Sequence, residues 1–305
     1  MKSTFIPIDY DYFDFEGKNY ALIIGRDQNF KRVCLIDECD VYLWAILRPN
    51  LNEAKIKKLI EKISKIELDL KGRKTKVEKV EIKNKKFLEK PVQALKIYAT
   101  NYKDLHDIAD KLDYPEIEKR RGYDLGYTTH YIIEKKLEPL SEYEIEGEML
   151  NNSNEFGGID SSLNADFVIK VNSFKEIKKE KARLFAPKVL AYDIETDSLQ
   201  IGEGEILMIS LVGKDFQKVI TWKKAETKQK FVEFVEDEKE LLEKFCEYVK
   251  QQSPDILTGY YSDGFDLPYI KARADKLKVR LPLGIDGSQP RFSTGINTSA
   301  RIKGI

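Results

Sequence analysis

The sequence predicts a mixed α/β protein with two domains. Strand-like and helix-like patterns alternate through residues 1–140, and a second alternating section opens at Lys188, after a polar stretch rich in turn residues. The chain has 305 residues, of which 42% are hydrophobic and 11% aromatic, so it can bury two cores. We therefore expect an α+β domain at 1–140, a linker with one short strand at 141–186, and an α/β domain at 187–305.

The first section is expected to have a ferredoxin-like arrangement. Apolar residues recur at helical spacing between Asn52 and Ile66, with Asn52 as the N-cap. The expected elements are strands at 21–24 and 41–47, a helix at 52–66, strands at 76–83 and 92–100, and a helix at 103–112. The order strand, helix, strand, strand, helix is typical of a split βαβ sandwich.

The linker is placed where this pattern weakens. Residues 151–154 are Asn-Asn-Ser-Asn and residues 157–158 are two glycines, a composition that favours turns. A short strand is expected from Phe167 to Val171.

The second section is expected to be an α/β sheet. An apolar strand ends at Asp193, and a capping-box pattern at Asp237 predicts the start of a helix. A further helix is expected after Asp266, with Pro268 in its first turn. The other expected strands lie at 206–212, 218–222 and 255–258.

Composition excludes several classes of function. Basic and acidic residues balance at 52 each, so no overall field draws the protein to nucleic acid or a membrane surface, and any nucleic-acid surface must be local. Cys34, Cys39 and Cys246 show no paired metal spacing, which indicates free thiols in a reducing cytosol. The two histidines lie far apart, which argues against a zinc site, and no apolar run approaches the ~18 residues of a membrane helix. We expect a cytoplasmic protein.

Three carboxylates carry the strongest chemical pattern. Asp193 and Glu195 stand two apart at the end of a strand, so alternation puts them on one side, and Asp266 follows a second strand about seventy residues later. Because open α/β sheets keep their sites at the carboxyl ends of strands, the three could meet and bind Mg²⁺ or Mn²⁺ for phosphodiester hydrolysis. The alternative is that Asp193 and Glu195 end a surface strand while Asp266 caps a helix.

At these residues the chain resembles a known family. Asp193-Ile194-Glu195 resembles the first exonuclease motif of family B DNA polymerases, and the run from Tyr260 to Asp266 resembles the second. The tail from Gly284 to Pro290 is similar to the segment that follows in archaeal members. The resemblance implies an RNase H-like fold, a nucleoid-associated enzyme, and a role for Asp193, Glu195 and Asp266 as catalytic metal ligands that remove a mispaired 3′ nucleotide.

The resemblance also implies that the exonuclease site is incomplete. Tyr261 stands where the family usually has Asn, and the third exonuclease motif and the palm motifs of the polymerase site are expected beyond Ile305. We therefore expect the front part of a DNA-directed DNA polymerase, with single-stranded or primer-template DNA, the remainder of the polymerase and a sliding clamp as partners.

The first section resembles the archaeal N-terminal domain that inspects the template and stalls on uracil. The segments that carry this resemblance are 10–12, 41–47 and 85–91. The positions that match its pocket are Tyr12, Val41, Tyr42, Pro91, Ala94 and Tyr127. A flipped pyrimidine needs a flat apolar slot and polar groups for its edge, which these residue types could supply. Gly126 replaces the usual Pro and His130 the usual Arg; alternatively, Val41, Tyr42 and Pro91 are core and turn residues.

A basic run offers a further DNA contact. Residues 71–90 hold nine basic and three acidic residues, enough to contact phosphates, although such a run is also typical of a solvated face. Two other functions stay open: a standalone sensor of template damage without catalysis, and a freestanding nuclease in which Asp263 supplies a replacement carboxylate.

Overall fold

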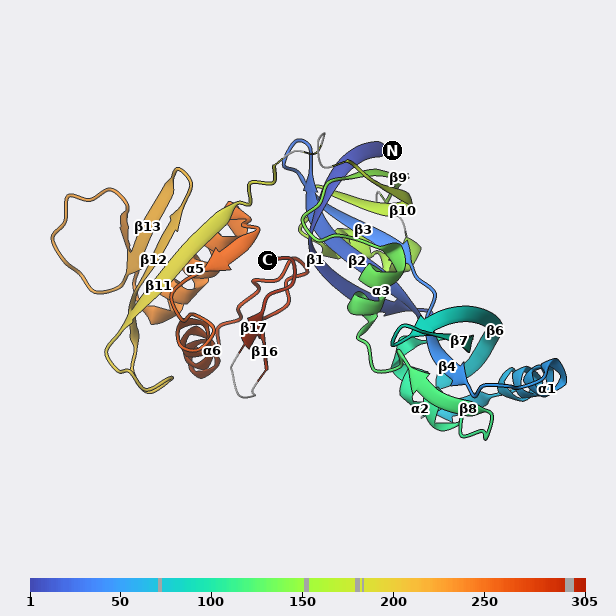
Figure 1. The fold of residues 1–305 in the computed structure, drawn as a ribbon. Coiled ribbons are helices and arrows are strands. Elements are labelled where there is room, and N and C mark those ends of the chain that lie inside the picture. Colours follow the sequence, from blue (N-terminus) through green and yellow to red (C-terminus); the bar gives the residue numbers. More distant parts are fainter. Residues whose placement is uncertain (71–72, 151–153, 179–181, 183, 294–298) are drawn as a thin grey trace.

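The computed structural model describes residues 1–70, 73–150, 154–178, 182, 184–293 and 299–305. Figure 1 shows a central β-barrel, a lobe on one side that holds residues 42–121, and a unit on the other side that holds residues 189–277. The mixed α/β class expected from the sequence is confirmed.

The barrel is closed by strands from two distant parts of the chain. It runs in the order β1-β2-β3-β10-β9, with β9 antiparallel to β1 and β10 parallel to β3. Its strands are β1 (Lys2–Phe15), β2 (Lys18–Asp27), β3 (Arg32–Glu38), β9 (Tyr143–Met149) and β10 (Phe167–Glu176). Both β9 and β10 lie in the stretch expected to be a linker, and β10 contains the short strand expected at 167–171. The Asn151 to Ser153 part of the expected turn lies outside the described residues.

Three short helical elements complete this region. They are α3 (Tyr127–Lys135), η2 (Glu155–Gly157) and α4 (Ile159–Ser162). The first of them, α3, contacts β1 and β2 on the outside of the barrel.

The lobe has a ferredoxin-like strand order, but this arrangement covers only β4 to β8 and not the whole of residues 1–140, because β1, β2 and β3 belong to the barrel. Its sheet runs β5-β6-β7-β4-β8, and every neighbouring pair is antiparallel. Its elements are β4 (Tyr42–Leu47), α1 (Glu53–Ile63), β5 (Glu67–Leu70), β6 (Arg73–Phe87), β7 (Lys90–Ala99), η1 (Tyr102–Asp104), α2 (Leu105–Asp110) and β8 (Ile117–Arg121). The Asn52 side chain accepts a hydrogen bond from the backbone N–H of Lys55, which confirms the predicted N-cap of α1.

The third unit is a five-stranded sheet with helices packed on it. The order is β14-β13-β12-β11-β15, with β11 antiparallel to β12 and parallel to β15. Its elements are β11 (Val189–Thr196), β12 (Ile206–Gly213), β13 (Phe216–Thr221), β14 (Val232–Phe234), α5 (Glu238–Gln252), β15 (Ile256–Thr258), α6 (Asp266–Leu277), β16 (Arg291–Ser293) and β17 (Ser299–Arg301). The predicted N-cap is present, because Asp237 accepts from the backbone N–H of Glu240. The Glu240 side chain accepts from the backbone N–H of Glu236, one residue before the position that a capping box uses.

The two helices of this unit are joined by a buried ion pair. Arg273 of α6 pairs with Glu238 of α5, and Glu238 also accepts a hydrogen bond of 2.8 Å from the backbone N–H of Ile206. Because all these polar atoms are buried, the pair ties α5, α6 and β12 to one another.

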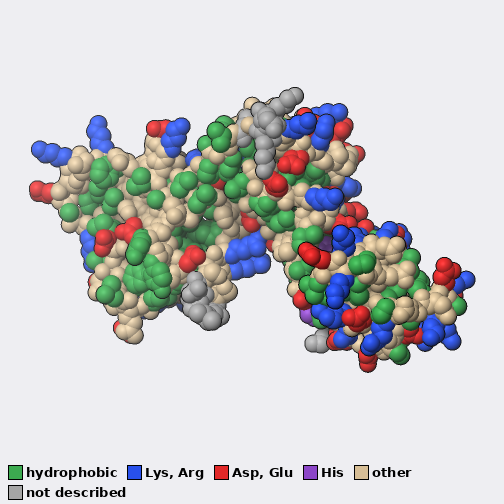
Figure 2. Space-filling view, viewed as in Figure 1, with side chains coloured by type: hydrophobic (Ala, Val, Ile, Leu, Met, Phe, Trp, Pro, Cys, Tyr) green, Lys and Arg blue, Asp and Glu red, His purple; other side chains and the backbone are tan. Residues whose placement is uncertain are grey.

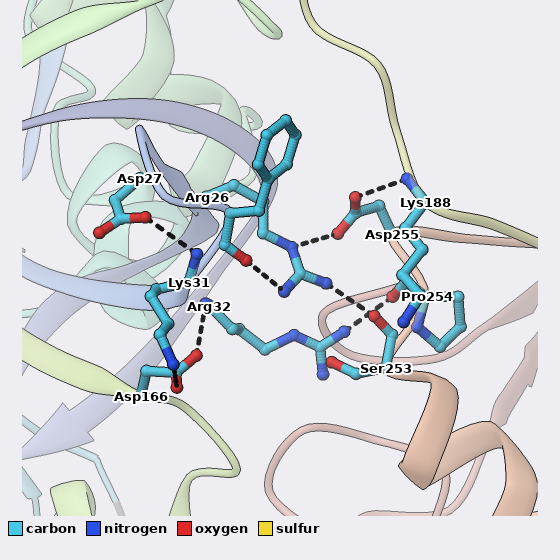
Figure 3. A network of polar contacts seen from close by, with 10 residues as sticks. Arg26, Asp27, Lys31, Arg32, Asp166, Lys188, Ser253, Pro254 and Asp255 are labelled. Carbon is cyan, nitrogen blue, oxygen red and sulfur yellow. Dashed lines mark hydrogen bonds and ion pairs between the residues drawn. The ribbon is translucent and has the colours of Figure 1, made fainter. Parts of the chain in front are cut away.

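The barrel and the third unit meet through a second polar network (Figure 3). Arg26 of β2 donates to Asp255 at 2.6 Å and to the Ser253 carbonyl at 2.7 Å, and Arg32 of β3 donates to the Pro254 carbonyl at 2.7 Å. Arg26, Arg32 and Asp255 are all buried. The backbone N–H of Lys188 donates to the other oxygen of Asp255, so the entry into β11 is held against the barrel.

No helix among the described residues is long and apolar enough to cross a membrane.

Candidate functional site

Asp193 and Glu195 lie on the open face of β11. Their neighbours Tyr192 and Ile194 point the other way, into the core with α5 and α6, as strand alternation predicts. Both carboxylates are exposed, and within the described ranges neither makes a side-chain hydrogen bond or an ion pair. They are therefore available to a ligand from outside the chain.

Asp266 is held beside these carboxylates by the backbone of β11. It is the first residue of α6 and only 3% exposed, and one carboxylate oxygen accepts a hydrogen bond of 3.3 Å from the backbone N–H of Ile194. Burial raises the pKa of Asp266, and the nearby negative charge of Asp193 raises it further. Asp193 and Asp266 are thus close enough to repel one another.

Glu195 is not drawn into the same cluster. It lies two residues further along β11 than Asp193, so the Cα atoms of the two residues are about 7 Å apart at the usual rise of a strand. Among the described residues, no group of three His, Cys, Asp or Glu side chains is gathered tightly enough to hold a metal ion. The structure therefore brings Asp193 and Asp266 near one another, and it leaves Glu195 on the same face of β11 as Asp193.

A cleft of about 730 Å³ lies next to this edge. Its walls include Tyr192, Gly259, the loop residues from Tyr261 to Gly264, and Ala300 and Ile302 of the C-terminal segment. The cleft does not include Asp193, Glu195 or Asp266 in its lining, so it adjoins the carboxylates without containing them.

The six residues predicted to form a base pocket fall into separate groups. The rings of Tyr12 and Tyr127 are 5.2 Å apart, and Val41 and Tyr42 are buried where β4 begins. Ala94 is buried on β7, but it pairs with Ile46, four residues from Tyr42 and thus roughly 13 Å along the strand. Pro91 is exposed next to the β6–β7 turn, and alternation assigns it to the opposite face from Ala94.

Tyr42 belongs to a polar cluster that sequence reasoning did not find. The Tyr42 cluster comprises Tyr42, Lys96, His130 and Glu134. The Tyr42 hydroxyl donates to Glu134 at 2.6 Å, and Lys96 pairs with Glu134 at 3.2 Å while its Nζ lies 3.7 Å from the centre of the Tyr42 ring. The His130 ring is 4.3 Å from that of Tyr42, and its Nε2 is 3.0 Å from the Asp40 carbonyl. Lys96 and Glu134 lie 38 residues apart in the chain, so no local pattern could have paired them.

The pKa values within the Tyr42 cluster follow from these contacts. Burial raises the pKa of Tyr42 and lowers that of His130, which favours the neutral imidazole. Burial works against the charge of Glu134, but the hydrogen bonds from Tyr42 and Lys96 outweigh it and lower the pKa of Glu134. Tyr42, Lys96 and Glu134 therefore have partners inside the cluster, whereas the ring nitrogen of His130 is paired with the Asp40 carbonyl outside it.

The basic run of the sequence lies mostly on β6, except that Lys71 and Gly72 are outside the described residues. Lys83 pairs with Glu81 at 3.1 Å, while Lys85 lies 5.2 Å from the centre of the Trp44 ring on the same sheet. Lys119 and Arg121 of β8 both lie 5.4 Å from the Phe87 ring. On the face of this lobe that Figure 2 shows, Lys and Arg side chains are spread out and mixed with Asp and Glu and are not gathered into one patch.

Comparison with known proteins identifies the family. The model of the DNA polymerase family B exonuclease domain matches residues 118–301. The chain belongs to DNA polymerase family B. The resemblance inferred from the exonuclease motifs is thereby confirmed, and Asp193, Glu195, Asp266 and Tyr127 all lie within the matched range.

Archaeal members of this family match nearly the whole chain. It is 30% identical to a DNA polymerase of Pyrococcus glycovorans over 302 residues. The aligned region covers 97% of this chain and 32% of that protein. A DNA polymerase of Thermococcus kodakarensis is also 30% identical over 97% of this chain, but only 15% of its own length is covered. The chain therefore spans a third or less of these family B relatives.

A solved family B polymerase has the same fold in this region. The structure of the enzyme from the hyperthermophilic archaeon Pyrobaculum calidifontis aligns with a TM-score of 0.72 over 95% of this chain and 35% of its own. At 21% identity this likeness supports the fold alone.

Proposed function

We propose that this chain forms part of a family B DNA polymerase and contributes its 3′ to 5′ exonuclease site, with Asp193, Glu195 and Asp266 as metal ligands. One observation carries the proposal. The backbone N–H of Ile194 holds Asp266 near Asp193, and the exposed carboxylates of Asp193 and Glu195 have no hydrogen-bond or ion-pair partner among the described residues.

The residues fit a hard divalent cation. Carboxylate oxygens are the ligands that Mg²⁺ and Mn²⁺ prefer, and such ions supply Lewis-acid stabilisation and a water of lowered pKa to phosphodiester hydrolysis. Asp266 must lose its proton to act as a ligand, and its raised pKa makes that loss dependent on pH. Asp193 and Asp266 repel each other without a cation, so binding one relieves the repulsion.

The gap between Glu195 and the other two carboxylates suggests that the site is completed by further groups. We propose that these come from DNA and from other parts of the polymerase, and that a sliding clamp is a partner of the whole enzyme. A freestanding nuclease that uses Asp263 remains the alternative, since Asp263 is exposed on the loop before α6.

A melting experiment with metal tests the carboxylate assignment. Mn²⁺ at ten times its dissociation constant should stabilise the chain by ~1.4 kcal/mol, which is about 2 °C for a chain of this size. Asp193→Asn should remove this shift, while Asp215→Asn, an exposed acidic residue in the β12–β13 turn, should keep it. An equal shift in both variants would mean that Mn²⁺ binds elsewhere. Metal-dependent cleavage of single-stranded DNA by the chain alone would favour the freestanding nuclease.

We propose second that the first section contacts the template and senses uracil in it. The supporting observation is a cleft of about 400 Å³ lined by Val41, Tyr98 and Glu134, next to a lobe whose sheet pairs Lys85 with Trp44 and Arg121 with Phe87. Basic side chains beside aromatic rings suit a single strand, because rings stack on bases while cations contact phosphates.

Binding of single-stranded DNA with one uracil, compared with the same strand carrying thymine, tests this second proposal. A preference for uracil that persists as salt is raised would support a close-fitting pocket, since contacts limit discrimination of one methyl group to roughly 1–3 kcal/mol. Equal and salt-sensitive binding of both strands would overturn uracil sensing and leave general DNA contact.

A further inference from the structure

The loop between β15 and α6 holds an aromatic ring in the open. Tyr261 is 72% exposed, and its φ of +55° lies in the left-handed region that few residues other than glycine adopt. An exposed aromatic side chain on a strained backbone gains nothing for the core, and such strain is concentrated at binding and catalytic sites.

One side of the Tyr261 ring is supported by Gly264. A Cβ added at Gly264 would lie 2.3 Å from the Cζ of Tyr261 and 2.5 Å from its Cε1, so only a glycine leaves room for the ring there. The ring is therefore supported by backbone at this position, and most of its surface remains open to solvent.

The ring also lines the cleft of about 730 Å³ beside the carboxylates. That volume is in the range of small-ligand sites and is large enough for one nucleotide base. Asp263, on the same wall, disfavours a phosphate in the cleft but not an uncharged base. Tyr192 lines the cleft as well and directly precedes Asp193, so a base in the cleft would bring its strand to the carboxylate edge.

We propose that Tyr261 stacks on an unpaired base of a single-stranded nucleic acid whose 3′ end approaches Asp193 and Asp266. The inference rests on the proposed exonuclease function and adds a binding residue to that site. Stacking on an aromatic ring tolerates every base, because each has a π-face, and this suits a site that must accept any 3′ terminus.

Tyr260 provides a matched control. It is the neighbouring residue, has the same side chain and is 94% exposed, but it does not line the cleft. If any aromatic surface on the loop were enough, removing Tyr260 or Tyr261 would weaken DNA binding equally. Stacking in the cleft predicts that only the removal of Tyr261 weakens it.

The test is binding of the full chain to a short single-stranded DNA with a label at its 5′ end, measured by anisotropy in EDTA so that nothing is cleaved. Tyr261→Ala should weaken binding by about 5- to 150-fold, the usual cost of losing one base stack. Tyr261→Phe should bind like the wild type, and Tyr260→Ala should stay within about twofold of it. Gly264→Ala, which displaces the ring without removing it, should give an intermediate loss.

An abasic nucleotide near the 3′ end separates stacking from other DNA contacts. Removing the base should weaken binding by the wild type by the same factor as Tyr261→Ala weakens binding of the normal strand. The Tyr261→Ala variant should bind the abasic strand as tightly as it binds the normal strand. If Tyr261→Ala binds the normal strand as tightly as the wild type, or if the two losses simply multiply, the proposal is wrong. This assay contains no metal, so a dependence of binding on both the Tyr261 ring and the base can be observed even if Mn²⁺ does not raise the melting temperature. The stacking proposal and the metal-site proposal can therefore fail independently.

Discussion

The Tyr42 cluster and the carboxylate edge of β11 both place charged groups near proposed nucleic-acid contacts, but they do so in opposite ways. In the Tyr42 cluster, Glu134 is bonded to Tyr42 and Lys96, and the charges are balanced within the protein. At the carboxylate edge, Asp193 and Asp266 repel one another and Asp193 has no cation beside it among the described residues. A closed cluster of this kind stabilises the fold, whereas an open one needs a ligand to balance it.

The largest expected effect lies in the closed cluster. Glu134→Ala should cost about 2–3 kcal/mol of unfolding free energy, because the largely buried ammonium of Lys96 and the hydroxyl of Tyr42 both lose their acceptor. Urea denaturation measures the loss. The double variant Glu134→Leu with Lys96→Met should recover part of it, and a double variant no more stable than Glu134→Ala would show that the charge of Lys96 is not the cause.

A smaller loss is expected from the hydroxyl of Tyr42 alone. Tyr42→Phe keeps the ring under Lys96 and removes one hydrogen bond to Glu134, which should cost about 1 kcal/mol in the same denaturation assay. No change in stability would mean that water replaces the hydroxyl, and the cluster would then be less closed than its contacts indicate.

The open edge should barely respond when metal is absent. Asp193→Asn and Glu195→Gln should each change the unfolding free energy by less than about 0.5 kcal/mol, because neither side chain has a partner to lose. Asp193→Asn should act in the stabilising direction, since it removes the charge that faces Asp266. A loss above 1 kcal/mol in either variant would contradict the comparison.

The finest distinction is one of sign in the pH dependence. The pKa of Glu134 is lowered from 4.5, so its contribution to the free energy of unfolding is fully present above that pH and is lost as the pH falls through the lowered pKa. The pKa of Asp266 is raised from 3.8, so its contribution to the free energy of unfolding is fully present below that pH and is lost as the pH rises through the raised pKa. Glu134→Gln should therefore flatten the loss of stability in acid, and Asp266→Asn should flatten the loss toward neutral pH. Slopes that change in the same direction for both variants would remove the contrast.

Much of the fold could be predicted because its determinants are local. The caps at Asn52 and Asp237 and the ferredoxin-like order are visible in short runs of sequence, and alternation alone put Asp193 and Glu195 on one face. The strand β9 also alternates, with Tyr143 and Ile145 inward and glutamates outward, but this pattern was missed within a polar stretch.

What could not be predicted depends on contacts between distant residues. The bond from Tyr42 to Glu134 spans 92 residues, and the network of Arg26 with Asp255 spans 229. Nothing in a single sequence relates such positions. Tyr261 could not be predicted for a different and local reason, since its place over Gly264 follows from a backbone conformation that its residue type does not favour.

The closure of the barrel by β9 and β10 has a consequence for the order of events during synthesis. The residues of β1 from Lys2 to Phe5 pair with β9, which the ribosome adds some 140 residues later, after roughly 7–30 s at usual elongation rates. The edge of β1 is unpaired until then, and the edge of β3 is unpaired until β10 follows, while the lobe encoded between β3 and β9 can already fold from its own hairpins. The nascent chain should thus complete its lobe first and close its barrel last, because the edge of β3 is paired only when β10 is added.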